Sequence, residues 1–341
     1  MKAVYHVEQK KHYPLQFLVN GVFRPNPEMP ERLDRLLQGA LAAGCTPEVS
    51  ENHGIAPIRE IHCGAYLEFL EHAWERWQRI DGAAAAVTPN IHPHRRNTGY
   101  PASVVAQAGY HMADAAVPIA DHSWLSSCRS AWAAVHAAKL ILAGDHSAYA
   151  LCRPPGHHAF HDMGGGFCYL NNSAIGAQVL RGTYDRVAIL DIDLHHGNGT
   201  QSIFYARDDV LTVSLHADPL RFYPFFWGYA NERGKGRGEG FNLNLPLPRG
   251  SGDREFIEAL SMGLERIQDF APGALVIALG LDAFEGDPFG GLCISTRGFG
   301  EIGAAIARSL PLPTLVVQEG GYLCDELGDN LTCFLQGFMQ E

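Results

Sequence analysis

Two carboxylates and an imidazole, those of Asp191, Asp193 and His195, lie within five consecutive positions of the chain. They directly follow the apolar run 187–190, where a buried strand is expected to end. Side chains of these types can converge on one cation, and a catalytic zinc has three protein ligands and an open position for water. Asp282 also follows an apolar run and can supply the third ligand. The pattern predicts a metal centre rather than a polar turn held by salt bridges.

A second segment, residues 153–168, combines adjacent histidines with residues that shape a turn. Pro154 and Pro155 stiffen the backbone, and Gly156 permits a tight turn just before His157 and His158. A lone histidine is more often structural than catalytic. Two adjacent imidazoles in this frame, beside a metal segment, predict a catalytic pair.

A third segment, 319–322, reads Glu-Gly-Gly-Tyr and follows the apolar run 314–317. The two glycines free the backbone to aim Tyr322, whose hydroxyl can donate to a developing oxyanion. Alone this pattern is weak, because Gly-Gly-Tyr is also a common turn.

The polar groups just described follow apolar runs that alternate with amphipathic stretches. Strands are expected at 3–7, 187–190, 210–215, 274–279 and 314–317, and helices at 66–80, 130–142, 172–180, 254–270 and 300–309. This alternation predicts a mainly parallel sheet covered on both faces. Asp191, His216, Asp282 and Glu319 each follow a different strand, so we expect them to meet at the carboxyl edge of the sheet.

Two long segments, 81–103 and 217–240, show no regular period and are expected to be functional or flexible loops. The second loop carries a Gly-Lys-Gly-Arg-Gly run without the spacing of a phosphate loop. It also carries aromatic residues that would line a channel, pack within the loop or form a subunit interface: Phe222, Tyr223, Phe225, Phe226, Trp227 and Tyr229.

The length, composition and charge of the whole chain limit the classes of protein to which it can belong. Its 341 residues, 46% of them hydrophobic, suffice for one large α/β domain spanning 1–341. A net charge of −11 argues against nucleic-acid binding and suits a cationic substrate. The eight cysteines form no CxxC pair, which favours free thiols in a reducing compartment. Because neither a signal peptide nor a membrane-spanning apolar run is found, we expect a cytoplasmic protein with no membrane partner.

Six motifs occur in order along residues 59–334: RPPGHH, GGGFCYLNN, DIDLHHGNGT, VSLH, LGLDAFEGDP and QEGGY. Together they resemble the histone deacetylase and acetylpolyamine amidohydrolase family. Residues 3–33, the loop 81–103 and the FYPFFWGYANERGKG segment most resemble the bacterial acetylpolyamine amidohydrolases. The resemblance implies a single domain with the three-layer α/β/α arginase–deacetylase fold. It also implies that the loop 81–103 shapes the active-site gorge and a homodimer interface.

The resemblance further implies a role for individual residues. Zinc would be held by Asp193, His195 and Asp282, with His157 and His158 as the imidazole pair and Tyr322 as carbonyl polariser. Asp191 would pair with His157 and Asn198 with His158. A structural potassium would lie at Asp191, Asp193, His195, Ser214 and Leu215, a second monovalent cation at Phe204, Arg207, Val210 and Phe241, and the substrate crevice at Gly166, Phe167 and Tyr223.

The partners of the two histidines predict different roles for them. A carboxylate raises the pKa of an imidazole, whereas a neutral amide does so far less. We therefore expect His157 to be largely protonated as an electrostatic stabiliser, and His158 to be neutral and to act as general base. The expected reaction is hydrolysis of an acetyl amide by a metal-activated water.

The substrate is the open question. Val105 and Ala116 stand where some acetylpolyamine amidohydrolases carry glutamates, which favours acetylputrescine or acetylcadaverine over acetylspermine. Asp114, Asp218 or Glu285 remain candidates for negative charge near the substrate. Acetyl-lysine in proteins is the alternative, disfavoured if the loop 81–103 narrows the entrance. An arginase-type ureohydrolase uses two manganese ions and more carboxylates, and it is disfavoured because this chain has no Asp-x-Asp pair around Asp282. A non-catalytic acyl-ligand binder is disfavoured because it would not need the complete motif set.

Overall fold

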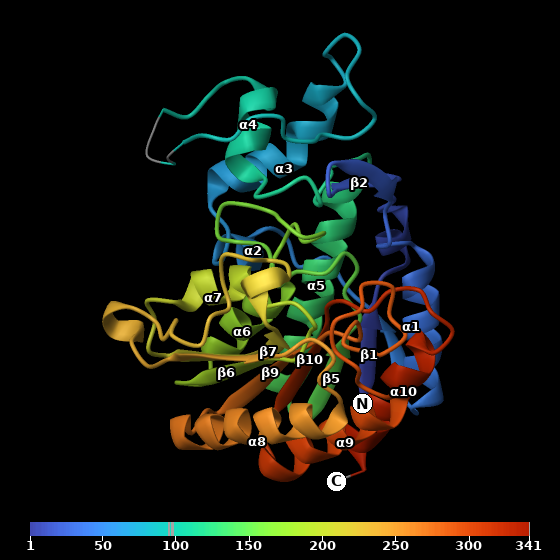
Figure 1. Ribbon diagram of the computed structural model, residues 1–341, viewed down its shortest axis with the longest axis vertical. Helices are drawn as coiled ribbons and strands as arrows, with labels where there is room; N and C mark the ends of the chain where they lie inside the picture. The colour runs from blue at the N-terminus through green and yellow to red at the C-terminus, as the bar shows by residue number, and fades with distance from the viewer. Residues whose placement is uncertain (95, 97–98, 341) are drawn as a thin grey trace.

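The computed structural model describes residues 1–94, 96 and 99–340 (Figure 1). Its centre is an eight-stranded sheet in the order β4-β1-β5-β10-β9-β6-β7-β8, in which every neighbouring pair is parallel. The strands are β1 (Lys2–Tyr5), β4 (Thr46–Val49), β5 (Ser147–Ala150), β6 (Val187–Asp191), β7 (Val210–Ala217), β8 (Asn242–Leu247), β9 (Ala274–Leu279) and β10 (Thr314–Gln318).

Alternate residues of the central strands enter two separate hydrophobic cores. In β6, Val187 and Ile189 lie in one core, while Ala188 and Leu190 lie in the other. Because both faces of the sheet are covered, these strands are continuous apolar runs rather than alternating ones. The predicted three-layer α/β/α architecture is confirmed.

Helices of two groups form the outer layers. The first core is closed by α3 (Gly64–Trp77), α4 (Val104–His111), α5 (Ser123–Leu142) and α6 (Asn172–Arg181). The second is closed by α1 (Glu31–Ala42), α8 (Asp253–Phe270), α9 (Thr296–Ser309) and α10 (Leu327–Met339). Figure 1 shows α5 and α6 on one side of the sheet and α8 and α9 on the other.

Three sequence predictions need correction. His216 does not follow a strand but lies inside β7, which continues to Ala217 because it pairs with β8 over its last residues. The first strand ends at Tyr5 rather than at residue 7, because the side chain of His6 caps a 3-10 turn, η1 (Val7–Lys11). Helix α5 also begins seven residues before the predicted 130, at Ser123, through a stretch whose small buried serines hide its helical period.

The two long loops differ in how they are held. The segment 81–103 has little regular structure in its described part, and its residues 95, 97 and 98 lie outside the described residues. Its first half is tied to α3, where the indoles of Trp74 and Trp77 donate to the carbonyls of Ala85 and Ala84. The segment 217–240 contains two short turns, η2 (Pro219–Arg221) and η3 (Gly236–Gly238).

Smaller elements complete the described chain: the hairpin β2 (Gln16–Val19) and β3 (Val22–Pro25), and the short helices α2 (Ala56–Arg59) and α7 (Asn198–Phe204). None of the helices in the described part of the chain is long and apolar enough to cross a membrane.

Candidate active site

The candidate site lies at the carboxyl ends of β6, β9 and β10. Asp191 is the last residue of β6, Asp282 lies three residues beyond β9, and Glu319 directly follows β10. Because neighbouring parallel strands end at the same edge, these three positions come together although 128 residues separate the first from the last (319 − 191). All three side chains are buried.

A metal-binding set forms at this edge. The ligand atoms of Asp193, His195 and Asp282 lie within 4.8 Å of one another. Nδ1 of His195 is 3.0 Å from an Asp282 oxygen and 3.3 Å from an Asp193 oxygen. Burial raises the pKa of Asp282, and the neighbouring Asp193 carboxylate adds to the shift. Two crowded buried carboxylates and one imidazole nitrogen fit a divalent metal ion, which would relieve their mutual repulsion.

Backbone amides orient the outer sides of these carboxylates. The N–H of Gly320 donates to Asp193 Oδ2 at 2.8 Å, and the N–H of Leu194 donates to Asp282 Oδ1 at 3.1 Å. A Cβ on Gly320 would lie 2.4 Å from Asp282, and one on Gly280 would lie 2.1 Å from Asp193. Both positions therefore need glycine for the backbone to come this close to the carboxylates. Such outer contacts fix ligand orientation in metal sites.

The adjacent histidines lie beside this set, and one contacts a charged partner whereas the other contacts a neutral one. Nδ1 of His157 is 3.0 Å from Asp191 Oδ2, and Nδ1 of His158 is 2.7 Å from the side-chain oxygen of Asn198. Burial lowers the pKa of the His157 imidazole, but the carboxylates of Asp193 and Asp191 outweigh it and raise the pKa well above its usual value.

For His158, burial and the positive charge of His157 both lower the pKa well below its usual value. The pKa values of the two imidazoles, whose ring centres lie 4.0 Å apart, are therefore shifted in opposite directions, upward for His157 and downward for His158.

A second group of possible ligand atoms, from His157, Cys168 and Glu319, also lies within 4.8 Å. The chemistry of this group is less suited to a metal ion. Burial raises the pKa of the Cys168 thiol well above its usual range, and the Glu319 carboxylate already accepts three hydrogen bonds. The Asp193, His195 and Asp282 set is therefore the better metal centre.

Aromatic rings enclose the imidazoles and Tyr322. The ring of Tyr223 is edge-on to that of His158, with their centres 4.9 Å apart. The ring centres of Phe167 and Tyr322 are 5.9 Å apart. Gly166 has a φ of 49°, and a Cβ there would lie 2.5 Å from the His158 ring, so glycine is required for this approach. The structure thus places Gly166, Phe167 and Tyr223 beside the candidate catalytic groups.

Other rings also lie at the site, and of these sequence reasoning named only Phe222. Phe222 stacks on His195 at 5.3 Å, and Phe289 lies 4.7 Å from Tyr322. Phe222 lies in the long segment 217–240, and Phe289 directly follows the LGLDAFEGDP motif, so proximity to a motif is a usable signal. Phe17, which packs 5.3 Å from Phe167, comes from the β2–β3 hairpin and has no such signal.

Arg32 is a buried cation that sequence reasoning also missed. Its guanidinium donates to the carbonyl oxygens of Gly321 at 2.6 Å and Glu319 at 2.8 Å, and it lies 4.9 Å from the ring centre of Tyr322. Glu28, one helical turn earlier, pairs with it at 2.6 Å. Burial raises the pKa of Tyr322 well above its usual value, and the Arg32 charge opposes that shift. Tyr322 therefore stays a protonated donor.

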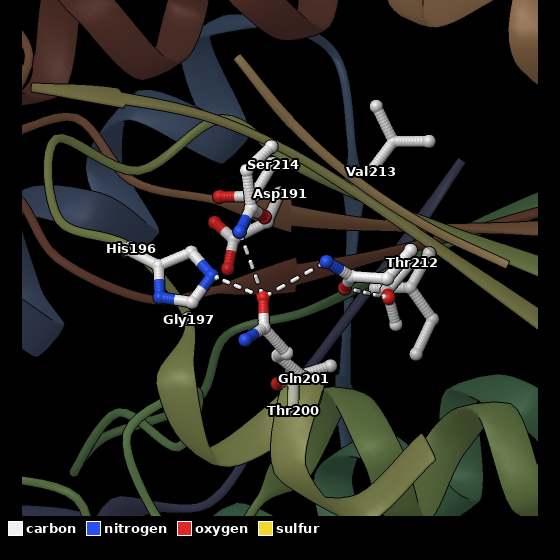
Figure 2. Close-up of a pocket in the computed structure, with 11 residues that line it drawn as sticks. Asp191, His196, Gly197, Thr200, Gln201, Thr212, Val213 and Ser214 are labelled. Carbon is white, nitrogen blue, oxygen red and sulfur yellow. Dashed lines mark hydrogen bonds between the residues drawn. The ribbon is translucent and has the colours of Figure 1, made fainter. Parts of the chain in front are cut away.

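The predicted potassium ligands divide into two groups. Asp191 and Ser214 are paired across β6 and β7, and both line a small cavity shown in Figure 2. There Gln201 accepts hydrogen bonds from the side chains of His196, Asn242 and Asn244. Leu215, the next residue of β7, turns its side chain into the second core.

The second group surrounds the start of β7. Phe204 ends α7, Arg207 pairs with Asp209, Val210 begins β7, and Phe241 directly precedes β8. The described contacts do not single out a cation position among these four residues.

Comparisons with known proteins agree with this geometry. The model of the histone deacetylase domain matches residues 26–338. The acetylpolyamine amidohydrolase of Burkholderia pseudomallei is 45% identical, covering 99% of this chain and 98% of that protein. Acetylpolyamine amidohydrolase 1 of Pseudomonas aeruginosa is 42% identical, with 99% of each covered.

The fold gives the same result. A crystal structure of acetylpolyamine aminohydrolase from Burkholderia pseudomallei superposes with a TM-score of 0.96 at 44% identity, covering 99% of this chain and 98% of that one. The resemblance read from the motifs is confirmed: the chain belongs to the histone deacetylase family, a family of metal-dependent deacetylases.

Proposed function

We propose that this enzyme uses zinc to hydrolyse the acetyl amide of small acetylated amines such as acetylputrescine and acetylcadaverine. The observation that carries the chemistry is the buried Asp193, His195 and Asp282 set with His157, His158 and Tyr322 around it. The substrate class is supported by four relatives named acetylpolyamine amidohydrolases, which are 39–45% identical over 99% of this chain.

The chain's own residues divide the work of the reaction. When bound, zinc would polarise the acetyl carbonyl and lower the pKa of a water molecule. The Nδ1–H of His158 donates a hydrogen bond to the side-chain oxygen of Asn198. Nε2 therefore keeps a lone pair that can take a proton from the attacking water. The His157 imidazolium and the Tyr322 hydroxyl stabilise the negative charge that develops on the substrate oxygen. The proton held on His158 then passes to the departing amine.

The charge around the site supports a cationic substrate. Asp114 is partly exposed, and its carboxylate accepts from the Tyr223 hydroxyl at 2.6 Å and from the Gly166 N–H at 3.2 Å. Burial raises the pKa of the Asp114 carboxyl, whereas the hydrogen bonds from Tyr223, Ala116 and Gly166 lower it and stabilise the charged form, which can attract an ammonium group. Of the other two candidate carboxylates, Asp218 instead caps η2, and Glu285 is exposed.

The test is amine release from a panel of amides by protein loaded with one zinc per subunit. Acetylputrescine, acetylcadaverine, acetylspermidine, acetylspermine and an acetyl-lysine peptide cover the candidates. Acetylbutylamine, which has the same chain length as acetylputrescine but no ammonium, is the matched control. We expect the acetylated diamines to be the best substrates and acetylbutylamine to be poor. Preference for the peptide would identify a lysine deacetylase instead.

Two further expectations also belong to the proposal. A potassium ion at the Asp191 and Ser214 position is supported by the polar cavity beside them, where Asn244 has a buried oxygen without a hydrogen bond. A homodimer formed through the loop 81–103 is supported by exposed apolar side chains on that loop, Ile91 and Tyr100. Elemental analysis for potassium and light scattering for mass would test them.

A further inference from the structure

We propose that Glu319 is a positioning residue, which fixes the turn carrying His157 and His158 against the end of β10. Its side chain would set where the two imidazoles stand relative to Asp193, His195 and Asp282. This inference rests on the proposed roles of His157 and His158, but it names a residue that those roles do not include.

The contacts of the Glu319 carboxylate reach the histidine turn directly. Oε2 accepts from the backbone N–H of Gly156 at 2.6 Å and of His157 at 3.0 Å, while Oε1 accepts from the Ser173 hydroxyl at 2.6 Å. The side chain is fully buried, so water does not compete for these donors. Buried N–H groups need a partner, and Glu319 supplies it for two consecutive residues of the turn.

The opposite side of the same turn is fixed independently. The Pro154 carbonyl accepts from the Ser130 hydroxyl at 2.7 Å and from the Asn172 amide at 3.2 Å. A Cβ on Gly156 would lie 2.4 Å from the Asn172 nitrogen, so the turn packs closely against the start of α6. Ser130 and Asn172 therefore hold the start of the turn, and Glu319 holds the part that bears His157.

Glu319 also belongs to the segment that touches the metal set. The N–H of the next residue, Gly320, donates to Asp193 Oδ2, and Tyr322 lies two residues further on. The segment 319–322 thus contacts the backbone of the histidine turn through the Glu319 side chain and a metal ligand through the Gly320 amide. It also carries the hydroxyl donor Tyr322. A shift of the histidine turn relative to this segment would misplace the base relative to the reacting water.

Hydrogen-bond geometry rather than charge alone is the expected basis of this effect. Burial raises the pKa of Glu319 to about 7, opposed by the nearby His157 charge and by the hydrogen bonds from Ser173 and Gly156. A glutamine has the same shape. Its side-chain oxygen can accept from both turn amides, and its NH2 can donate to Ser173. Glu319→Gln should therefore keep the turn in place, whereas Glu319→Ala should release it.

The experiment compares Glu319→Ala, Glu319→Gln and Tyr149→Phe in the zinc-loaded enzyme. Tyr149→Phe is the matched control, because it removes a buried hydrogen bond to the neighbouring Gln318 without touching the histidine turn. The measurements are kcat and KM for acetylputrescine, zinc per subunit, Tm, and the downfield imidazole N–H proton of His157. A His157→Ala spectrum assigns that proton.

For Glu319→Ala we expect kcat to fall about 100-fold with little change in KM, as for a misplacement of about 1 Å. Zinc should stay at one per subunit, and the His157 proton should shift. Glu319→Gln should stay within about threefold of wild type with the proton unmoved, and Tyr149→Phe should lose Tm but not kcat.

The proposal is overturned if Glu319→Ala keeps kcat, or loses it only in proportion to lost zinc. If Glu319→Ala does not fold, the glutamine variant decides. A large loss of kcat in Glu319→Gln with the His157 proton unmoved would assign a charge effect and contradict positioning. The proton shift is read without substrate. It therefore tests Glu319 even if acetylputrescine proves not to be a substrate.

Discussion

The strand ends beneath the site and the segments around it are built differently. At the strand ends, Asp193, Asp282 and Glu319 are fully buried, and each accepts hydrogen bonds from backbone amides. In the surrounding segments, Phe23, Ile91 and Phe226 leave 58%, 60% and 77% of their area exposed. We call the first set the floor and the β2–β3 hairpin with the loops 81–103 and 217–240 the rim. The floor is suited to fixed chemistry, and the rim is suited to selecting what reaches it.

The largest effect should come from removing a metal ligand in the floor. Asp282→Ala removes one of three convergent donors, so we expect bound zinc to drop below one per subunit and turnover to become undetectable. Elemental analysis and amine release measure the two quantities. Glu285→Ala, an exposed change three residues away, is the control and should alter neither. Full zinc retention by Asp282→Ala would show that the ligand set is wrong.

Removing the proposed base should be next in size. His158→Ala should lower kcat about 10²–10⁴-fold, the usual contribution of a general base, while zinc stays bound. His157→Ala, the neighbouring control, should be the less damaging change. If the order is reversed, and His158→Ala retains substantial activity, the two roles must be exchanged.

The neutral partner of His158 predicts a shift of the pH profile. Asn198→Asp places a carboxylate against Nδ1 of His158, which raises the pKa of the imidazole. A base with a raised pKa stays protonated, and so inactive, up to a higher pH. The acidic limb of the kcat/KM profile should therefore move to higher pH, whereas Asn52→Asp, an exposed change outside the site, should leave it in place. An unmoved acidic limb would mean that His158 is not the group that titrates there.

A change at the junction of floor and rim should alter selectivity rather than chemistry. Asp114→Asn keeps the shape of the side chain and removes its charge. We expect the ratio of kcat/KM for acetylputrescine over acetylbutylamine to fall about fivefold, as for the loss of about 1 kcal/mol of charge attraction. Tyr223→Phe removes the donor but keeps the charge, and should preserve more of the ratio. Equal losses for both amides would rule out ammonium recognition.

The smallest effect should come from an isolated rim side chain. Phe226→Ala removes a ring that is mostly exposed, so the free energy of unfolding should change by no more than about 0.5 kcal/mol. Urea unfolding measures it, with buried Phe299→Ala as a contrast expected to lose about 3 kcal/mol or more. A large loss for Phe226→Ala would show that the ring is covered in solution, as in a dimer.

The floor was readable from the sequence because its signals are local. Each polar group follows an apolar run of four to six residues, and parallel strands bring those run ends to one edge. Glycines at 197, 280 and 320 mark places where the backbone closely approaches an aspartate carboxylate of the site. The local pattern therefore specified both the layer architecture and the residues gathered in the floor.

The rim and the buried supports were not readable, because they depend on contacts between distant segments. Arg32 donates a hydrogen bond to Gly321, which lies 289 positions later in the sequence. The ring of Phe17 packs against that of Phe167, 150 positions later (167 − 17). The amino-acid composition of these segments does not predict these contacts. The placement of His216 inside β7 was missed for a related reason: pairing with β8 extends the strand beyond its apolar run.

Zinc titration of the metal-free protein, followed by acetylputrescine hydrolysis, tests the central claim most directly. The account predicts that activity rises in proportion to zinc and levels off at one zinc per subunit, and that Asp282→Ala shows no such rise. Activity that needs two metal ions, or that is indifferent to zinc, would contradict a single centre formed by Asp193, His195 and Asp282.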